Sequence, residues 1–405
     1  MTKHPYNSTV LEKPMLEDYQ DGDFFLSSPN QTLLGKGSLL TVPGNEEKEN
    51  QMEDLANRVA ATLERAKRLG QDNPIVTGAI PFDYKKPANL HVPETIHSTV
   101  RVQEYGPSRT VETDSVPTYQ IKSVPEPAQY KEGVEEGLVQ IASGHLDKIV
   151  LARSLQLTSS ISVNINELLH NLARQNTKGY TFAVDLGEQE DSSVCTKTLI
   201  GASPELLVSR TGLHVVANPL AGSRPRSDDP VEDQRRSKEL LSSSKDLHEH
   251  AVVVEAVAEA LRPFFKKMEV PKSPSVISTE TMWHLSTEVK GELVDPETSS
   301  LELAIALHPT PAVCGSPFER ARESILEIEP FDRGYFTGMV GWCDANGDGE
   351  WIVTIRCAEV EEKALRLFAG AGVVGESKPE EELAETSAKF QTMLRAMGID
   401  TELSK

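Results

Sequence analysis

The stretch from Arg333 to Lys389 reads RGYFTGMVGWCDANGDGEWIVTIRCAEVEEKALRLFAGAGVVGESKPEEELAETSAK and decides the fold. It contains three strand-like runs, Tyr335–Cys343, Trp351–Val360 and Ala364–Ala369. The segments between them, DANGDG and EEK, are short enough for hairpins. The pattern therefore predicts an antiparallel meander.

Arg356 is a charged residue in the middle run, both faces of which are otherwise mostly apolar. A buried guanidinium needs an anionic partner, because an unpaired charge is costly away from water. We therefore expect Arg356 to point into an enclosed space that binds an anion.

The third run leads into GAGVVG, residues 370–375, which matches the dinucleotide-binding fingerprint letter for letter. Only about 30 residues follow, too few to complete a dinucleotide-binding βαβ unit. We instead expect Gly370 and Gly372 to let the backbone approach a ligand closely.

A helix is expected to begin at Pro379, with Glu382, Glu385 and Lys389 within about 60° of one another on its surface. Taken alone, this helix favours a solvated flank with a Glu385–Lys389 pair over a functional cluster.

Composition bounds the possible functions. At 405 residues, 38% hydrophobic and 25% charged, the chain can bury a large core, and it has no apolar run that would span a bilayer. The first 20 residues lack the apolar region of a signal peptide. A net charge of −21 argues against nucleic acid and anionic membranes as partners, so any anionic substrate needs local cations or a metal.

Four cysteines without CxxC spacing indicate ordinary thiols in a reducing cytoplasm: Cys195, Cys314, Cys343 and Cys357. Residues 1–20 are expected to be a flexible N-terminus, and residues 21–405 one domain. Residues 101–128, with four prolines, predict a long surface connection. Many strands with helices between them predict an α+β protein of large, mostly antiparallel sheets.

Residues Glu232–Phe264 predict the longest helix, with Glu249 in the middle of its apolar stripe beside Val253. This carboxylate should face inward, compensated either by an interior salt bridge or by a metal ion. His248 and His250 lie two residues apart, on opposite sides of the helix, and do not form a zinc pair.

Lys148 begins an apolar strand in DKIVLAR, and Glu205 follows Ser-Pro in GASPELLV. Each alone is best explained by a structural ion pair. Together with Arg356 and Glu249, they suggest an enclosed site with a base, an acid, an anion clamp and carboxylates for a hard metal ion.

The chain resembles the chorismate-utilising enzymes, which include anthranilate synthase component I, aminodeoxychorismate synthase, salicylate synthase and isochorismate synthase. The resemblance is dense over residues 130–395 and rests on nine motifs in the same order: KIVLAR, GASPELLV, PLAGSR, KDLHEH, TMWHLST, LHPTPAVCG, EPFDRGYFTGMVGW, IRCAEV and AGAGVVGESKPEEELAET. The early segments FFLSSPNQTLLGKG and GAIPFD look most like isochorismate synthases of 2,3-dihydroxybenzoate siderophore pathways. The fold implied is that of anthranilate synthase component I.

The resemblance also implies roles. Lys148 would be the general base that activates water for attack at C2 of chorismate, and Glu205 the general acid that protonates the departing C4 hydroxyl. Glu249 and Glu385 would hold Mg²⁺, with Glu382 bound directly or through water. The substrate contacts implied are Gly222, Ser223, His284, Ala312, Val313, Arg356, Gly370, Gly372 and Lys389.

These roles set electrostatic conditions. A lysine acts as a base near neutral pH only if its pKa lies well below about 10.4, and a glutamate acts as an acid only if its pKa is raised. Chorismate is a dianion, so an acidic protein needs Mg²⁺ and local cations to bind it.

Position 221 helps to separate the subclasses. Aminodeoxychorismate synthases typically carry a lysine nucleophile in this motif, where this chain has Ala221. Ammonia would require a glutamine amidotransferase partner, and the tryptophan-feedback motif of anthranilate synthase is missing at LLGKGS. Water is thus the expected nucleophile of a monomeric, cytoplasmic isochorismate synthase. The alternatives are a salicylate synthase, which goes on to eliminate pyruvate, and a non-catalytic chorismate-binding homologue.

Overall fold

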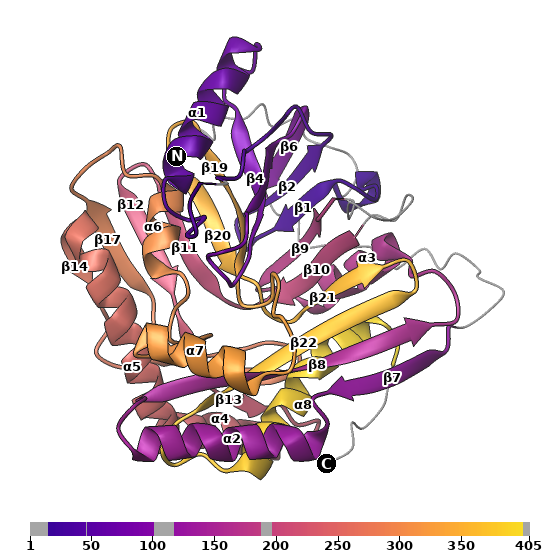
Figure 1. The fold of residues 1–405 in the computed structure, drawn as a ribbon, viewed down its shortest axis with the longest axis vertical. Coiled ribbons are helices and arrows are strands. Elements are labelled where there is room, and N and C mark those ends of the chain that lie inside the picture. The colour runs from indigo at the N-terminus through magenta and orange to yellow at the C-terminus, as the bar shows by residue number, and fades with distance from the viewer. Residues whose placement is uncertain (1–14, 46, 101–116, 188–196, 400–405) are drawn as a thin grey trace.

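Two large β-sheets dominate the computed structural model, which describes residues 15–45, 47–100, 117–187 and 197–399 (Figure 1). Each strand pair within the described residues is antiparallel. The ten-stranded sheet has the order β18 (Gly315–Ser316), β8 (Lys148–Ser159), β22 (Ala364–Val373), β21 (Cys357–Glu361), β10 (Lys197–Ser203), β9 (Tyr180–Asp185), β1 (Phe24–Ser27), β2 (Gln31–Lys36) and β6 (Thr95–Val100), with β7 (Tyr119–Val124) paired to β8.

The other two sheets complete the framework. The nine-stranded sheet has the order β14 (Phe265–Glu269), β17 (Val289–Leu293), β12 (His214–Asn218), β11 (Leu206–Thr211), β20 (Gly349–Val353), β19 (Met339–Asp344), β4 (Ile75–Ile80), β5 (Asn89–Val92) and β3 (Leu40–Thr41). The small sheet has the order β13 (Leu220–Pro225), β16 (Met282–Ser286) and β15 (Ser275–Ser278). The predicted α+β class with large antiparallel sheets is confirmed.

The two large sheets pack against each other, and helices cover their outer faces. Phe182 and Phe368 of the ten-stranded sheet share a buried cluster with Val340 and Ile352 of the nine-stranded sheet. The helices are α1 (Leu55–Arg68), α2 (Pro127–Ala142), α3 (Ile165–Gln175), α4 (Pro230–Ser242), α5 (Ser244–Leu261), α6 (Ser300–Leu307), α7 (Phe318–Ile328) and α8 (Pro379–Ala396), with short 3₁₀ turns η1 (Met15–Asp18) and η2 (Arg262–Phe264). Helices α1, α5 and α6 pack on the nine-stranded sheet, and α3 and α8 on the ten-stranded sheet.

The predicted meander is wrong in one informative way. Its middle run splits into β20 and β21, which belong to different sheets, so that two hairpins replace one meander. The chain crosses between the sheets at residues 354–356, where Arg356 has a φ of 52°. Both faces of the run are apolar because it passes from one buried sheet to another.

The predicted long helix is also wrong, because it divides into α4 and α5. The Ser243 side chain accepts a hydrogen bond from the Asp246 N–H group and so caps the start of α5. This second helix carries Glu249, which is buried as predicted.

Two segment predictions need correction. Residues 1–14 of the expected flexible N-terminus lie outside the described residues, but from Met15 the chain is ordered into η1, with Met15 and Leu16 buried in the core. Of the expected connection 101–128, residues 101–116 lie outside the described part; β7 and the start of α2 occupy most of the remainder. None of the described helices has the length and apolar character needed to cross a membrane.

Candidate active site

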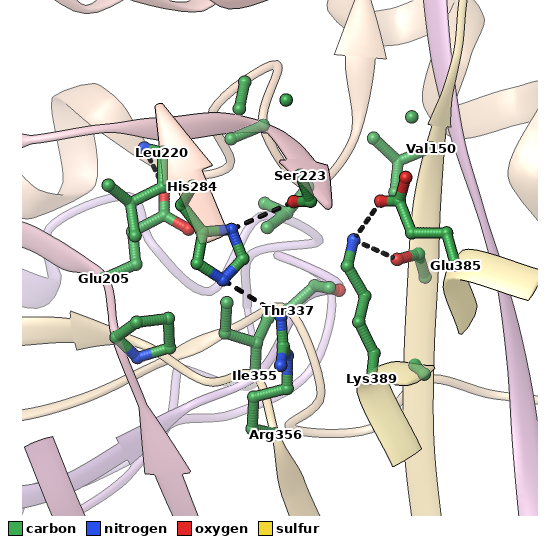
Figure 2. A pocket seen from close by; sticks show the side chains of 18 of the residues that line it. Val150, Glu205, Leu220, Ser223, His284, Thr337, Ile355, Arg356, Glu385 and Lys389 are labelled. Carbon is green, nitrogen blue, oxygen red and sulfur yellow. Dashed lines mark hydrogen bonds and ion pairs between the residues drawn. The ribbon is translucent and has the colours of Figure 1, made fainter. Parts of the chain in front are cut away.

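A cavity lies where the ends of β8 and β22, the chain crossing at residues 354–356, the small sheet and helices α5 and α8 meet (Figure 2). Its free volume is about 60 Å³, so a six-membered ring with two carboxylates requires the lining side chains to move apart. It is lined by Val150, Pro204, Glu205, Leu220, Ala221, Gly222, Ser223, Glu249, His284, Ala312, Val313, Phe336, Thr337, Ile355, Arg356, Phe368, Ala369, Gly370, Gly372, Glu385 and Lys389.

Twelve of the fourteen predicted site residues line this cavity, including all nine expected substrate contacts. The other two, Lys148 and Glu382, lie directly behind lining carboxylates and form part of the same charge network. The topology thus brings together residues that are up to 241 positions apart in the chain, from Lys148 to Lys389.

Lys148 is the first residue of β8, and its side chain is completely buried. Its Nζ atom lies 2.9 Å from Oε1 of Glu249 and makes no further hydrogen bond within the described residues. Gly372 on the neighbouring strand gives this pair its space, because a Cβ atom there would lie 2.1 Å from Glu249 Oε1 and 3.0 Å from Lys148 Cε. Gly372 therefore lies against the Lys148–Glu249 pair and also lines the cavity.

Glu205 stands at the turn between β10 and β11, after Pro204. It is 3% exposed, and burial raises the pKa of its carboxyl group to about 7. The Leu220 N–H group donates a hydrogen bond to Oε1 at 3.4 Å (Figure 2). The carboxyl group therefore retains its proton to a much higher pH than an exposed glutamate does, which is what a general acid requires.

Three carboxylates from α5 and α8 are each paired with a lysine. Glu249 pairs with Lys148 at 2.9 Å, Glu382 with Lys245 at 2.6 Å and Glu385 with Lys389 at 2.6 Å. The expected Glu385–Lys389 pair is present, but the expectation of a solvated flank is wrong, because Glu382 is buried and both Glu385 and Lys389 face the cavity. Of the two alternatives expected for Glu249, an interior salt bridge or a metal ion, the structure contains the salt bridge, which Glu249 forms with Lys148.

The carboxylates of α5 and α8 are candidate ligands for Mg²⁺. Within the described residues, no three His, Cys, Asp or Glu side chains lie close enough to form a metal site between them. The donor chemistry nevertheless fits, because Glu249 and Glu385 present hard oxygen atoms to one cavity. Burial, followed by the charge of Glu385, raises the pKa of Glu382 to about 7, a repulsion that a divalent cation would relieve.

Arg356, His284 and Ser223 form a hydrogen-bonded chain along one wall (Figure 2). Arg356 Nη2 lies 3.3 Å from His284 Nε2, and a guanidinium can only donate. Nε2 is thus the acceptor, and Nδ1 carries the proton that it donates to Ser223 Oγ at 2.9 Å. Burial, with the charge of Arg356, lowers the pKa of His284 well below its usual value, so the ring is neutral.

The expected anionic partner of Arg356 is not a protein carboxylate. Among the described residues, none forms an ion pair with it, and its hydrogen bonds go to His284 and Thr392. Arg356 is therefore a buried cation at the cavity wall, available to an anionic ligand.

Several lining residues were not among the predicted contacts. Thr337 has a φ of 62°, and its N–H group donates to the Thr354 carbonyl oxygen at 2.7 Å, beside the crossing to Arg356. Phe336 and Phe368 stack with ring centroids 5.1 Å apart and form an apolar wall. Phe336 and Thr337 lie within the motif EPFDRGYFTGMVGW, but a backbone conformation and a ring contact leave no pattern in the sequence.

Comparisons with known proteins point to one family. The family described as chorismate binding enzyme matches residues 88–398. Isochorismate synthase DhbC of Bacillus subtilis (strain 168) is 62% identical over 386 residues, which cover 95% of this chain and 96% of that protein.

Solved structures agree as well. DhbC from Bacillus anthracis, described provisionally as a 2,3-dihydroxybenzoate-specific isochorismate synthase, has a TM-score of 0.90 and 59% identity, covering 95% of this chain and 99% of that chain. Anthranilate synthase component I from Streptococcus pneumoniae TIGR4 shares the fold, with a TM-score of 0.66 at 20% identity over 96% of this chain and 95% of that chain. The chain belongs to the family of chorismate-binding enzymes.

Proposed function

We propose that this chain is an isochorismate synthase, which converts chorismate into isochorismate with Mg²⁺. The observation that carries the proposal is that two features meet at one cavity. One is the buried Lys148–Glu249 ion pair, and the other is the Glu205 carboxyl group with a pKa of about 7. A base at the start of β8 and a protonated acid at the turn between β10 and β11 suit an addition and a departure on one ring.

The reaction needs one proton removed and one supplied. Lys148 would take a proton from a water molecule as its oxygen forms the new bond to C2 of the ring. The ring double bonds shift, and the C4–O bond breaks as Glu205 gives its proton to the departing hydroxyl group. One water molecule enters and one leaves, so the product is an isomer of the substrate.

Cations of the chain would hold the two carboxylates of the substrate. Arg356 and Lys389 both line the cavity, and Arg356 has no protein carboxylate as a partner among the described residues. To reach the substrate, Lys389 would exchange its contacts to Glu385 and to the Gly370 carbonyl oxygen at 2.8 Å. Such an exchange would also enlarge the small cavity.

Mg²⁺ would be held by Glu249 and Glu385, with Glu382 behind them. When bound, the ion supplies positive charge for the ring carboxylate of chorismate. The chain's own part is to present the carboxylates and to move their lysine partners aside, since each carboxylate is engaged by a lysine.

The choice of water as nucleophile is supported by Ala221, which lines the cavity where an amine nucleophile would otherwise stand. We propose accordingly that no glutamine amidotransferase subunit is needed and that the enzyme acts as a cytoplasmic monomer. The three described cysteines are free and buried, which suits a reducing compartment. Light scattering on a sizing column would test the oligomeric state.

The decisive experiment incubates the purified protein with chorismate and Mg²⁺ and separates the products by chromatography. Isochorismate without salicylate is the expected result. Salicylate formed without an added lyase would instead indicate a salicylate synthase. Unconsumed chorismate that nevertheless binds would contradict catalysis and indicate a binding homologue. The 2,3-dihydroxybenzoate siderophore pathway is the proposed destination of the product.

A further inference from the structure

Arg333 and Glu329 form a buried ion pair behind the wall of the active-site cavity, and neither side chain lines it. Arg333 Nε donates to Glu329 Oε2 at 2.8 Å, and Nη2 donates to Oε1 at 2.5 Å. The contact is therefore bidentate, the geometry in which an arginine fork and a carboxylate fix each other's orientation.

The remaining donors of Arg333 hold three separate segments of the cavity wall. Nη1 donates to the Val313 carbonyl oxygen at 2.8 Å and to Thr337 Oγ1 at 3.2 Å, and Nη2 donates to the Val150 carbonyl oxygen at 2.8 Å. All five N–H donors of the guanidinium thus have acceptors, and the three partner residues all line the cavity.

Glu329 adds a fourth attachment. Its Oε1 atom accepts a hydrogen bond from the Ala152 N–H group at 2.8 Å, so the ion pair engages both a carbonyl and an amide of β8. Lys148 lies on this strand, on the same side as Val150 and Ala152. The ion pair thus fixes the strand that carries the general base.

The same guanidinium also reaches the opposite wall. The Thr337 hydroxyl oxygen accepts a hydrogen bond from Arg333 Nη1. The Thr337 N–H group donates to the carbonyl oxygen of Thr354, two residues before Arg356. The aromatic rings of Phe82 and Phe336 lie with their centroids 4.7 and 5.8 Å from the guanidinium carbon and limit its movement.

We propose that Arg333 and Glu329 are positioning residues for the reaction. The planar guanidinium, held by the carboxylate, sets the distances between the strand that bears Lys148, the wall at Val313 and the crossing that bears Arg356. The inference rests on the proposed isochorismate synthase function, which it deepens. A lysine at position 333 keeps the charge but has a single ammonium group and cannot hold all these acceptors in fixed directions.

A buried ion pair can also serve stability alone, and the chain offers a matched control. Arg210 is likewise buried, and it donates to the Asn346 carbonyl oxygen at 2.7 Å and to the Pro296 carbonyl oxygen at 2.6 Å. None of these residues lines the cavity. Arg210→Lys therefore removes a buried guanidinium that also binds two backbone carbonyl groups, without touching the site.

The test compares Arg333→Lys and Glu329→Asp with Arg210→Lys at a temperature where all variants are folded, by kcat, KM and amide hydrogen exchange. We expect kcat to fall about 100-fold in Arg333→Lys, with KM changing less, because misplacement of reacting groups acts on the chemical step. Exchange should rise in residues 148–153 and 310–314. Arg210→Lys should stay within about threefold of the wild-type kcat and leave these two segments protected.

Each outcome decides the proposal. A wild-type kcat in Arg333→Lys, or an equal loss in Arg210→Lys, would overturn it. If Arg333→Lys does not fold, Glu329→Asp decides by the same criteria, because it shortens the carboxylate while keeping its charge. If the wild-type enzyme leaves chorismate unchanged, the proposed function has failed, and hydrogen exchange alone then tests whether the fork holds these segments.

Discussion

The Nζ atom of Lys148 lies 2.9 Å from Oε1 of Glu249, with the lysine side chain wholly buried. The only ion-pair partner of the lysine among the described residues is thus a carboxylate that is also the proposed Mg²⁺ ligand. Base and metal site are therefore linked through one glutamate.

Replacing Lys148 with Ala should lower kcat by about 1,000-fold or more, since general-base assistance of this kind contributes 10²–10⁴-fold. Binding of chorismate, measured by calorimetry, should persist. Lys197→Ala is the control, because Lys197 also begins a strand of the same sheet and pairs with the buried Glu359 at 2.6 Å. An unchanged kcat in Lys148→Ala would remove this lysine from the mechanism.

The raised pKa of Glu205, about 7, predicts the alkaline side of the pH–rate profile. A general acid works in its protonated form, so kcat/KM should fall about tenfold per pH unit above pH 7. Glu205→Gln cannot supply the proton and should lower kcat by about 100-fold or more, with this alkaline decline lost. A Gln variant that keeps both the rate and the decline would show that another group is the acid.

Glu385→Gln should weaken Mg²⁺ binding at least about tenfold, because an amide is a poorer ligand for a hard cation and carries no charge. Calorimetric titration with Mg²⁺ measures this without turnover. Glu381→Gln on the same helix is the control, since Glu381 is exposed and pairs with Lys378. Equal Mg²⁺ affinity in both variants would contradict the assignment of Glu385.

The site was more predictable than the path of the chain that builds it. Lys148, Glu205 and Glu249 stand out because charged residues are unusual in the apolar patterns around them, but their expected roles come from the family resemblance. The crossing at Arg356 was missed because a strand that changes sheets keeps the apolar pattern of one continuous strand. A positive φ at an arginine leaves no trace in that pattern.

The helix error has a similar cause. Residues 230–261 keep helical periodicity, and the break at Ser243 depends on one side-chain cap rather than on a Pro or Gly signal. The role of Arg333 was also beyond the sequence. It depends on three acceptors, from Val150, Val313 and Thr337, that only the fold brings together.

The buried carboxyl group of Glu350 should make the stability of the fold depend on pH without affecting activity. It lies on β20, does not line the cavity, and has an Oε2 atom without a hydrogen-bond partner among the described residues. Burial raises the pKa of this carboxyl group from 4.5 to about 7. Between these values the native state binds more protons than the unfolded state, so this group makes stability fall as pH rises from about 4.5 to 7.

Glu350→Gln should remove that contribution, on the order of 3 kcal/mol above pH 7, and leave kcat unchanged. Denaturant unfolding at pH 5 and pH 8 measures it, with Glu327→Gln as the exposed control. An equal dependence of stability on pH in wild type and Glu350→Gln would contradict a raised pKa at this position.

Gly372 allows the sharpest steric test of the site, because a single methyl group there would occupy the space of the Lys148–Glu249 pair. The added Cβ atom would lie 2.1 Å from Glu249 Oε1, far inside van der Waals contact. Gly370, two residues earlier on β22, is the matched control, since its nearest neighbour would be Val150 Cγ1 at 3.3 Å. Gly372→Ala must displace Glu249, and we expect both a kcat about 100-fold lower and weaker Mg²⁺ binding, whereas Gly370→Ala should stay within about tenfold. If Gly372→Ala retained wild-type turnover and Mg²⁺ affinity, the Lys148–Glu249 pair would have no part in the reaction.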